Sequence, residues 1–111
     1  MIGIGTDILE LDRLEGTLLT RVAEYFLTPA EMVEYHTRRD KLAYVASRFA
    51  AKEAVIKAFP ERLSPHDFLI HKAGTKPTVI FLKPAHRKYR VLVSLSHSTR
   101  YVVGFAAVYD A

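Results

Sequence analysis

Two carboxylates and one lysine, far apart in the sequence, are the residues best suited to chemistry. Asp7 ends the N-terminal run MIGIGTD, while Glu53 and Lys57 lie in the run RFAAKEAVIKAF at residues 48–59. Mg²⁺ prefers carboxylate oxygens, and two such ligands leave positions for water and for the phosphate oxygens of a substrate. A lysine one helical turn beyond Glu53 could neutralise or protonate a departing phosphate. The three residues are therefore a candidate site for phosphate chemistry.

A purely structural interpretation of the same residues stays open. Glu53 and Lys57 are four residues apart, which is the spacing of an ordinary ion pair on a solvated helix face. Asp7 could cap a turn or the following helix. Local sequence does not choose between these roles and the chemical ones.

The run SLSHS at residues 94–98 is the second polar cluster, placed between two expected strands. Its hydroxyls and the His97 imidazole could donate hydrogen bonds to a phosphate, or the run could be a polar hairpin connection. Other chemistries lack their motifs, because the chain has no G-x-S-x-G, no H-E-x-x-H and no phosphate-binding glycine-rich loop.

A long helix must carry Glu53 and Lys57. Asp40 can cap it and Pro60 stops it. An arc of about 60° holds its expected core stripe, which is Leu42, Val45, Phe49 and Ile56. Ala46 and Ala50 share a column with Glu53 and Lys57, which predicts a shallow face that a backbone or a ligand can approach. Arg48 and Lys52 form a separate basic column on the other side of the stripe.

The remaining elements predict an α+β fold in a single domain of residues 1–111. The first strand presents Gly3 and Gly5 on a face that something can approach closely. A helix is expected from Asp12 to Phe26, and Thr28-Pro29-Ala30-Glu31 starts another that runs to about Arg38. Short connections predict an antiparallel meander, with strands at residues 68–72, 78–82, 89–96 and 101–109.

Charge and composition indicate the kind of partner. The net charge of +4 favours an anionic one, which could be nucleic acid, a phosphorylated small molecule or an acidic protein. The basic clusters RRDK at 38–41 and HRKYR at 86–90 keep a nucleic-acid-binding module as the alternative function. The chain has no cysteine, no apolar run long enough to span a membrane and no signal peptide, so we expect a soluble cytoplasmic protein.

Five segments in the right order give the chain a resemblance to a known family. They are GIGTDILELDR at 3–13, FLTPAEMVEY at 26–35, RFAAKEAVIKA at 48–58, TKP at 75–77 and SLSHS at 94–98. Together they resemble the holo-acyl-carrier-protein synthases, the small bacterial class of 4′-phosphopantetheinyl transferases. The first and third segments are specific as a pair, whereas SLSHS alone would be weak.

The resemblance implies transfer of 4′-phosphopantetheine from coenzyme A to a serine hydroxyl of apo-acyl carrier protein, releasing adenosine 3′,5′-bisphosphate. Asp7 and Glu53 match the family's Mg²⁺ ligands, and Lys57 matches the lysine that assists the leaving phosphate. A water molecule or Glu53 itself would deprotonate the serine. The column of Ala46 and Ala50 would then be the floor of the cleft.

The resemblance also implies the binding surfaces. Arg48 and His97 match contacts to the 3′-phosphate side of coenzyme A, and Lys76-Pro77 matches a turn beside the adenine. Arg13 and Arg21 match the basic surface that receives the acidic carrier protein. Family members form homotrimers with a site at each subunit interface, so we expect a homotrimer that binds neither nucleic acid nor membrane.

Two departures from the family concern the rim of the cleft, the trimer packing and the anchoring of His97. Members of the family usually have a full helix where residues 83–90, KPAHRKYR, leave room for about two turns at most. The residue after His97 is often acidic in the family and is Ser98 here. A third possible function is that of an inactive relative, which binds coenzyme A without transferring it.

Overall fold

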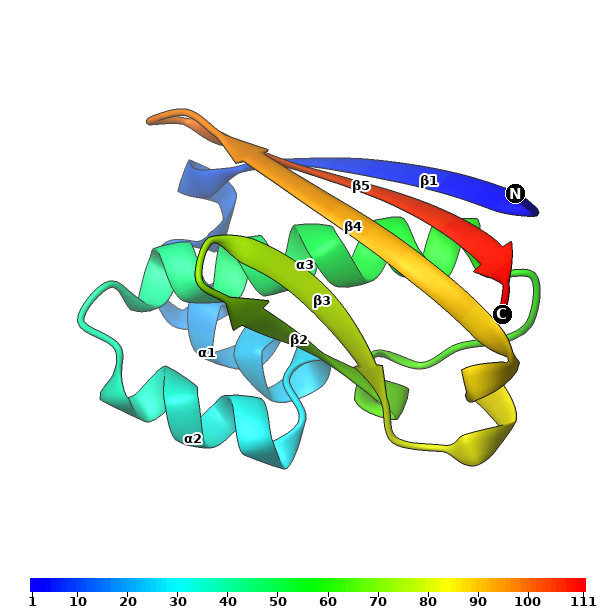
Figure 1. Ribbon diagram of the computed structural model, residues 1–111. Helices are drawn as coiled ribbons and strands as arrows, with labels where there is room; N and C mark the ends of the chain where they lie inside the picture. The colour runs from blue at the N-terminus through cyan, green and yellow to red at the C-terminus, as the bar shows by residue number, and fades with distance from the viewer.

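The computed structural model describes residues 1–111, in which a long helix lies against one face of a five-stranded antiparallel sheet (Figure 1). The strands are β1 (Gly3–Glu10), β2 (Phe68–Ala73), β3 (Lys76–Phe81), β4 (Tyr89–His97) and β5 (Tyr101–Asp110). Their order across the sheet is β1-β5-β4-β3-β2. The last four strands thus form the predicted meander, and the N-terminal strand joins its end. The predicted α+β fold is confirmed.

The three helices are α1 (Thr17–Phe26), α2 (Pro29–Thr37) and α3 (Lys41–Ala58). The predicted capping box of Thr28 and Glu31 starts α2, and the Asp40 carboxylate accepts a hydrogen bond of 2.9 Å from the Ala43 amide at the start of α3. Short 3₁₀ helices complete the fold as η1 (Leu11–Leu14), η2 (Pro65–Asp67) and η3 (Pro84–Lys88). The last of these confirms that residues 83–90 hold no full helix.

The predicted helix over residues 12–26 is wrong in one respect. Gly16 has a φ of 80°, a left-handed conformation that interrupts regular helix and separates η1 from α1. Arg13 therefore lies in η1 and Arg21 in α1, so the two arginines do not share one continuous helix.

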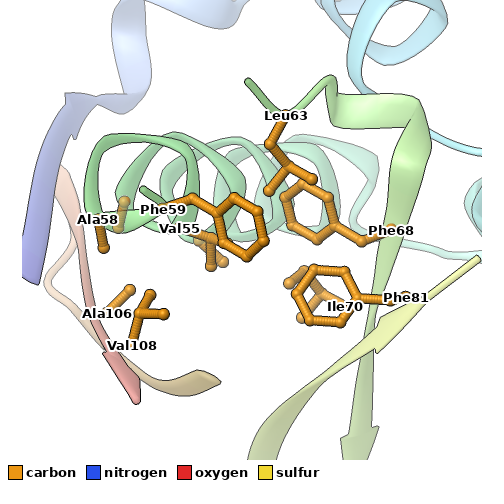
Figure 2. Close-up of a cluster of buried hydrophobic side chains, with 11 residues drawn as sticks. Val55, Ala58, Phe59, Leu63, Phe68, Ile70, Phe81, Ala106 and Val108 are labelled. Carbon is orange, nitrogen blue, oxygen red and sulfur yellow. The ribbon is translucent and has the colours of Figure 1, made fainter. Parts of the chain in front are cut away.

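Helix α3 is buried on most of its sides, because the sheet covers one face and α1 and α2 pack on the other (Figure 1). Of the predicted core stripe only Val45 is fully buried. The main core forms instead around Val55, where aromatic and aliphatic side chains from α3, β2, β3 and β5 meet (Figure 2). Its members include Ala51, Ala54, Ala58, Phe59, Phe68, Ile70, Phe81, Ala106 and Val108.

Glycines bring the backbones of β1 and β5 into direct contact with α3. A Cβ atom on Gly5 would lie 2.1 Å from the carbonyl oxygen of Ala54, and one on Gly104 would lie 2.4 Å from that of Ala50. The predicted close approach is thus made by the helix backbone. Ala46 and Ala50 are fully buried in this packing, so the interpretation of their column as the floor of a ligand cleft is wrong.

Lys52 is fully buried, which corrects its assignment to a basic column on the helix. Its ammonium donates to Glu31 Oε1 at 2.6 Å and to the carbonyl oxygens of Pro65, Phe26 and Phe68 at 2.7, 2.8 and 2.9 Å. Glu31 Oε2 in turn accepts a hydrogen bond of 2.9 Å from the Ile70 amide. This network joins α1, α2, α3, η2 and β2.

Replacing Lys52 should be strongly destabilising. Lys52→Met removes the counter-charge of the buried Glu31 carboxylate and the Lys52 donor of three carbonyl oxygens. We expect a loss of roughly 3–5 kcal/mol in the free energy of unfolding, measured by urea titration. The double variant Glu31→Gln with Lys52→Met leaves no unpaired buried charge and should recover part of that loss. A loss below about 1 kcal/mol for Lys52→Met would contradict the network's role.

Candidate functional site

Asp7 lies on the face of β1 that points toward α3, on the same side as Gly5 and Leu9. Its Oδ1 atom accepts a hydrogen bond of 3.1 Å from Lys57 Nζ, which also donates to the Thr6 carbonyl oxygen at 3.1 Å. The Oδ2 atom of Asp7 is buried and has no hydrogen-bond partner. A carboxylate oxygen in this state lacks compensation for its lost hydration.

Glu53 lies one turn before Lys57 on α3 and forms no ion pair with it, so the structural interpretation of these two residues as a helix pair is wrong. Lys57 pairs with Asp7 instead. Burial of the Glu53 carboxyl raises its pKa, the negative charge of Asp7 raises the pKa further, and Lys57 opposes both effects. The two carboxylates are thus close enough to repel one another.

Mg²⁺ fits these residues. The unpartnered oxygen of Asp7 and the repulsion between Asp7 and Glu53 are both relieved by a divalent cation. No third histidine, cysteine, aspartate or glutamate completes a metal-binding group around them. Water and substrate phosphate oxygens would have to fill the remaining positions, which is the usual way Mg²⁺ is held in phosphate-transfer sites.

A second site lies along the N-terminal half of α3, and we call it the basic cleft. It has a volume of about 650 Å³. Four cationic side chains and one imidazole line it, against a single acid, Asp40; the basic members are Arg38, Arg39, Arg48, Lys72 and His97. This charge distribution suits an anionic ligand.

Arg48 is the most constrained of these cations. Only 4% of the residue is exposed, and its guanidinium lies 4.1 Å from the centre of the Tyr44 ring. Its Nη1 atom donates to Ser47 Oγ at 3.3 Å, while its Nε is buried without a partner. Burial raises the pKa of Tyr44 to about 12, so the ring stays neutral beneath the guanidinium. The guanidinium of Arg48 is therefore held in a fixed position, and one of its donors has no hydrogen-bond partner within the chain.

Two residues of the run SLSHS have distinct places in the structure. His97 ends β4 and lines the basic cleft together with Arg48. Ser98 Oγ accepts hydrogen bonds of 3.2 and 3.1 Å from the amides of Arg100 and Tyr101 and so shapes the hairpin turn.

The other predicted contact residues lie apart from the basic cleft. Lys76 and Pro77 line a separate groove of about 490 Å³ between β3 and β4. These two strands pair only at Thr78 and Leu92, and both residues line the groove. Arg13 and Arg21 are exposed on η1 and α1 and form no ion pair within the chain.

Sequence reasoning missed four residues of the basic cleft: Arg38, Arg39, Tyr44 and Lys72. The two arginines were visible only as part of a charge cluster. Tyr44 lies four residues before Arg48, a spacing that could have indicated an aromatic ring under the guanidinium. Nothing local marked Lys72, because its place depends on how β2 packs against α3.

Most residues of the two basic clusters are engaged within the chain. Arg38 pairs with Glu34 at 2.8 Å, Lys88 pairs with Glu61 at 2.9 Å, and Arg87 donates to the Phe81 carbonyl oxygen at 3.1 Å. These contacts weaken the case for a continuous free basic face that tracks nucleic acid. No helix in the chain has the length and apolarity needed to cross a bilayer.

Comparison with known proteins gives one family. The sequence matches the 4′-phosphopantetheinyl transferase superfamily over residues 3–106. The holo-[acyl-carrier-protein] synthase of Maridesulfovibrio salexigens is 42% identical over 93 residues, which cover 77% of this chain and 74% of the relative.

Solved structures agree along almost the whole chain. The Bacillus anthracis holo-(acyl-carrier-protein) synthase, solved in complex with CoA (3′,5′-ADP), has a TM-score of 0.85 and 31% identity, covering 99% of this chain and 97% of its own. The Neisseria meningitidis holo-[acyl-carrier-protein] synthase has a TM-score of 0.82 and 33% identity, with coverages of 99% and 100%.

The raised pKa of Glu53 predicts a pH-dependent cost to stability. A carboxyl whose pKa is raised by folding stabilises the protein fully below its unfolded pKa and loses that contribution as the pH rises through the folded value. Glu53→Gln should therefore raise the free energy of unfolding at pH 7.5, by less than about 1 kcal/mol because water screens the site, and not at pH 4. Urea titrations without Mg²⁺ measure the difference.

The matched control is Glu24→Gln, which removes an exposed glutamate that has no partner in the structure and should change stability at neither pH. A Glu53→Gln variant that is less stable than the parent at pH 7.5 would contradict the repulsion between Asp7 and Glu53.

Proposed function

The chain belongs to the 4′-phosphopantetheinyl transferase superfamily and is a phosphopantetheinyl transferase, and we propose that it acts as a Mg²⁺-dependent holo-acyl-carrier-protein synthase. The observation that supports Mg²⁺ dependence is that the Asp7 and Glu53 carboxylates lie near one another and near Lys57. Asp7 has a buried oxygen without a partner, and the pKa of Glu53 is raised. The transferase domain we propose spans residues 1–111.

The proposed reaction transfers the 4′-phosphopantetheine group of coenzyme A to a serine oxygen. A serine oxygen of apo-acyl carrier protein attacks the phosphorus that bears the pantetheine arm of coenzyme A. The bond to the bridging oxygen of the pyrophosphate breaks, and adenosine 3′,5′-bisphosphate leaves with the electron pair. The serine proton passes to a water molecule or to Glu53.

Asp7 and Glu53 would hold Mg²⁺, which supplies charge neutralisation for the pyrophosphate oxygens when bound. Glu53, the freer of the two carboxylates, is also placed to accept a proton, because its raised pKa brings it closer to that of a useful base.

Lys57 is placed to act on the leaving group. Its side chain is 52% exposed while its ammonium holds Asp7 Oδ1, so the ammonium can turn from the carboxylate toward an incoming phosphate. There it would stabilise or protonate the departing phosphate oxygen.

The basic cleft would receive the nucleotide part of coenzyme A. Arg48 and His97 share this cleft, which supports their proposed contact with the 3′-phosphate. Lys76 and Pro77 lie in the neighbouring groove, and Leu95 lines both hollows. A site shared between two chains would explain why the proposed adenine-side residues do not line the same cleft.

The carrier protein would dock on the exposed arginines Arg13 and Arg21. Acyl carrier proteins are expected to be acidic, so these arginines would steer association and lose their effect as salt increases. The absence of cysteine suits the reducing cytoplasm, which we propose as the location.

An apolar surface on the sheet face away from α3 supports a homotrimer. Ile4 and Ile8 of β1 are 57% and 66% exposed, and Leu92 and Phe105 on the neighbouring strands are 53% and 44% exposed. Exposed apolar surface of this kind marks an interaction site, and a symmetric assembly of identical chains would cover it.

The transfer reaction tests the proposed function directly. Incubation of the protein with coenzyme A, Mg²⁺ and apo-acyl carrier protein should increase the mass of the carrier by one phosphopantetheine group. Asp7→Asn and Glu53→Gln should reduce the rate by more than the roughly 10- to 100-fold typical of outer-shell metal partners, because they remove direct ligands.

Asp110→Asn removes the same charge from an exposed position and serves as the control. Failure to modify any carrier, including that of the host, would refute the transferase. Tight binding of coenzyme A without turnover would identify an inactive relative instead.

Sedimentation velocity tests the trimer. The parent protein should sediment as three chains, and Ile8→Lys should dissociate it because a charge would enter the buried apolar face. Val33→Lys is the matched control, since Val33 is 68% exposed on α2, on a different surface. A monomeric parent at micromolar concentration would overturn the proposed assembly.

A further inference from the structure

Lys72 is the cation that the sheet contributes to the basic cleft. Arg38 and Arg39 come from the connection between α2 and α3, and Arg48 comes from α3 itself. Lys72 lies in β2 and lines the cleft from another wall. A ligand in the cleft would therefore meet positive charge from three separate parts of the chain.

The position of Lys72 is set by the packing of β2 on the helices. Phe68, Ile70 and Lys72 alternate along one face of the strand, and the first two are fully buried against α3. The Phe68 carbonyl oxygen accepts from Lys52 at 2.9 Å, and the Ile70 amide donates to Glu31 at 2.9 Å. The next side chain on this face is Lys72, so the network that anchors β2 also fixes the backbone from which Lys72 extends.

No group in the chain neutralises Lys72. It forms no ion pair or hydrogen bond, and the one acid in the cleft, Asp40, is engaged in capping α3. Partial burial lowers the pKa of Lys72, and the positive charges of Arg48 and Arg38 lower the pKa further. The cleft thus holds cations that repel one another, which an anion would relieve.

Arg48 and Lys72 would bind an anion in complementary ways. The guanidinium of Arg48 is almost fully buried and is held between Tyr44 and Ser47, so it cannot move to meet a ligand. Lys72 is exposed, and its flexible stem carries three donors that can adjust to a phosphate already seated on Arg48.

Lys72 also lies on a hairpin whose other strand borders the second hollow of the surface. It lies directly opposite Pro77 in the β2–β3 hairpin, whose residues Lys76 and Pro77 line the neighbouring groove. The hairpin therefore contributes Lys72 to the basic cleft and Lys76 and Pro77 to the neighbouring groove.

We propose that Lys72 is a further substrate-binding residue, which contacts the ribose phosphate monoester of the nucleotide together with Arg48 and makes the cleft select phosphorylated coenzyme A over dephospho-coenzyme A. The proposal rests on the proposed function for the identity of the substrate. A phosphate monoester carries close to two negative charges at neutral pH, which matches two converging cations better than a free hydroxyl does.

Two ligand pairs test the role of Lys72. Transfer to apo-acyl carrier protein is measured with coenzyme A and with dephospho-coenzyme A, and calorimetry compares adenosine 3′,5′-bisphosphate with adenosine 5′-monophosphate. Lys72→Met should reduce kcat/KM for coenzyme A about tenfold, mainly through KM, and leave that for dephospho-coenzyme A nearly unchanged. The affinity ratio of the two nucleotides should fall by a similar factor.

Arg62→Met is the matched control, because it removes the same charge from an exposed position with no partner in the structure and should leave both ratios unchanged. Lys72→Arg, which keeps the charge, should restore most of the selectivity. Lys72→Met with unchanged thermal stability and parental selectivity would overturn the proposal while the transferase stands. Absence of transfer by the parent would refute the proposed function, and the calorimetric ratio would still decide the role of Lys72.

Discussion

The ammonium group of Lys52 is the contact on which most of this fold depends. A lysine with no exposed surface loses its hydration, and burial accordingly lowers its pKa, but four protein oxygens replace the lost water. Those oxygens belong to α1, α2, η2 and β2, so one side chain of α3 joins four other elements. Arg48 lies one turn before Lys52 on α3, and Glu53 directly follows Lys52. The buried contact of Lys52 therefore helps to fix the position of both candidate sites.

The side of α3 that faces β1 and β5 lies close to the sheet because two glycines there have no side chains. Gly5 and Gly104 let the helix lie on the backbones of β1 and β5, and this short distance holds Asp7 beside Glu53 against their mutual repulsion. A site assembled this way resists the helix shift that would separate the carboxylates. In this arrangement the pKa of Glu53 is raised and one Asp7 oxygen has no hydrogen-bond partner. Perturbed carboxylates of this kind are typical of functional sites and suit a bound cation.

Patterns within one element were predictable from the sequence, and contacts between elements mostly were not. The capping box of Thr28 and Glu31, the four later strands and the glycine face of β1 follow from local spacing. The second role of Glu31 does not, because its partner Lys52 is distant in the chain. The same limit explains the errors at Ala46 and Ala50, where a small column was equally suited to a ligand and to β5. For the sites, the resemblance to a family supplied Arg48 and His97, which the structure places in one cleft, whereas Lys72 required knowledge of how β2 packs.

The pairing of β1 with β5 has a consequence for how the protein is made. Asp7 lies directly opposite Gly104, so nearly the whole length of the chain separates two backbone neighbours at the carboxylate site. During synthesis β1 cannot pair until β5 has been made, and the apolar residues on the outer face of β1 stay uncovered until then. The carboxylate site would therefore be among the last parts of the molecule to assemble, after the helices have formed.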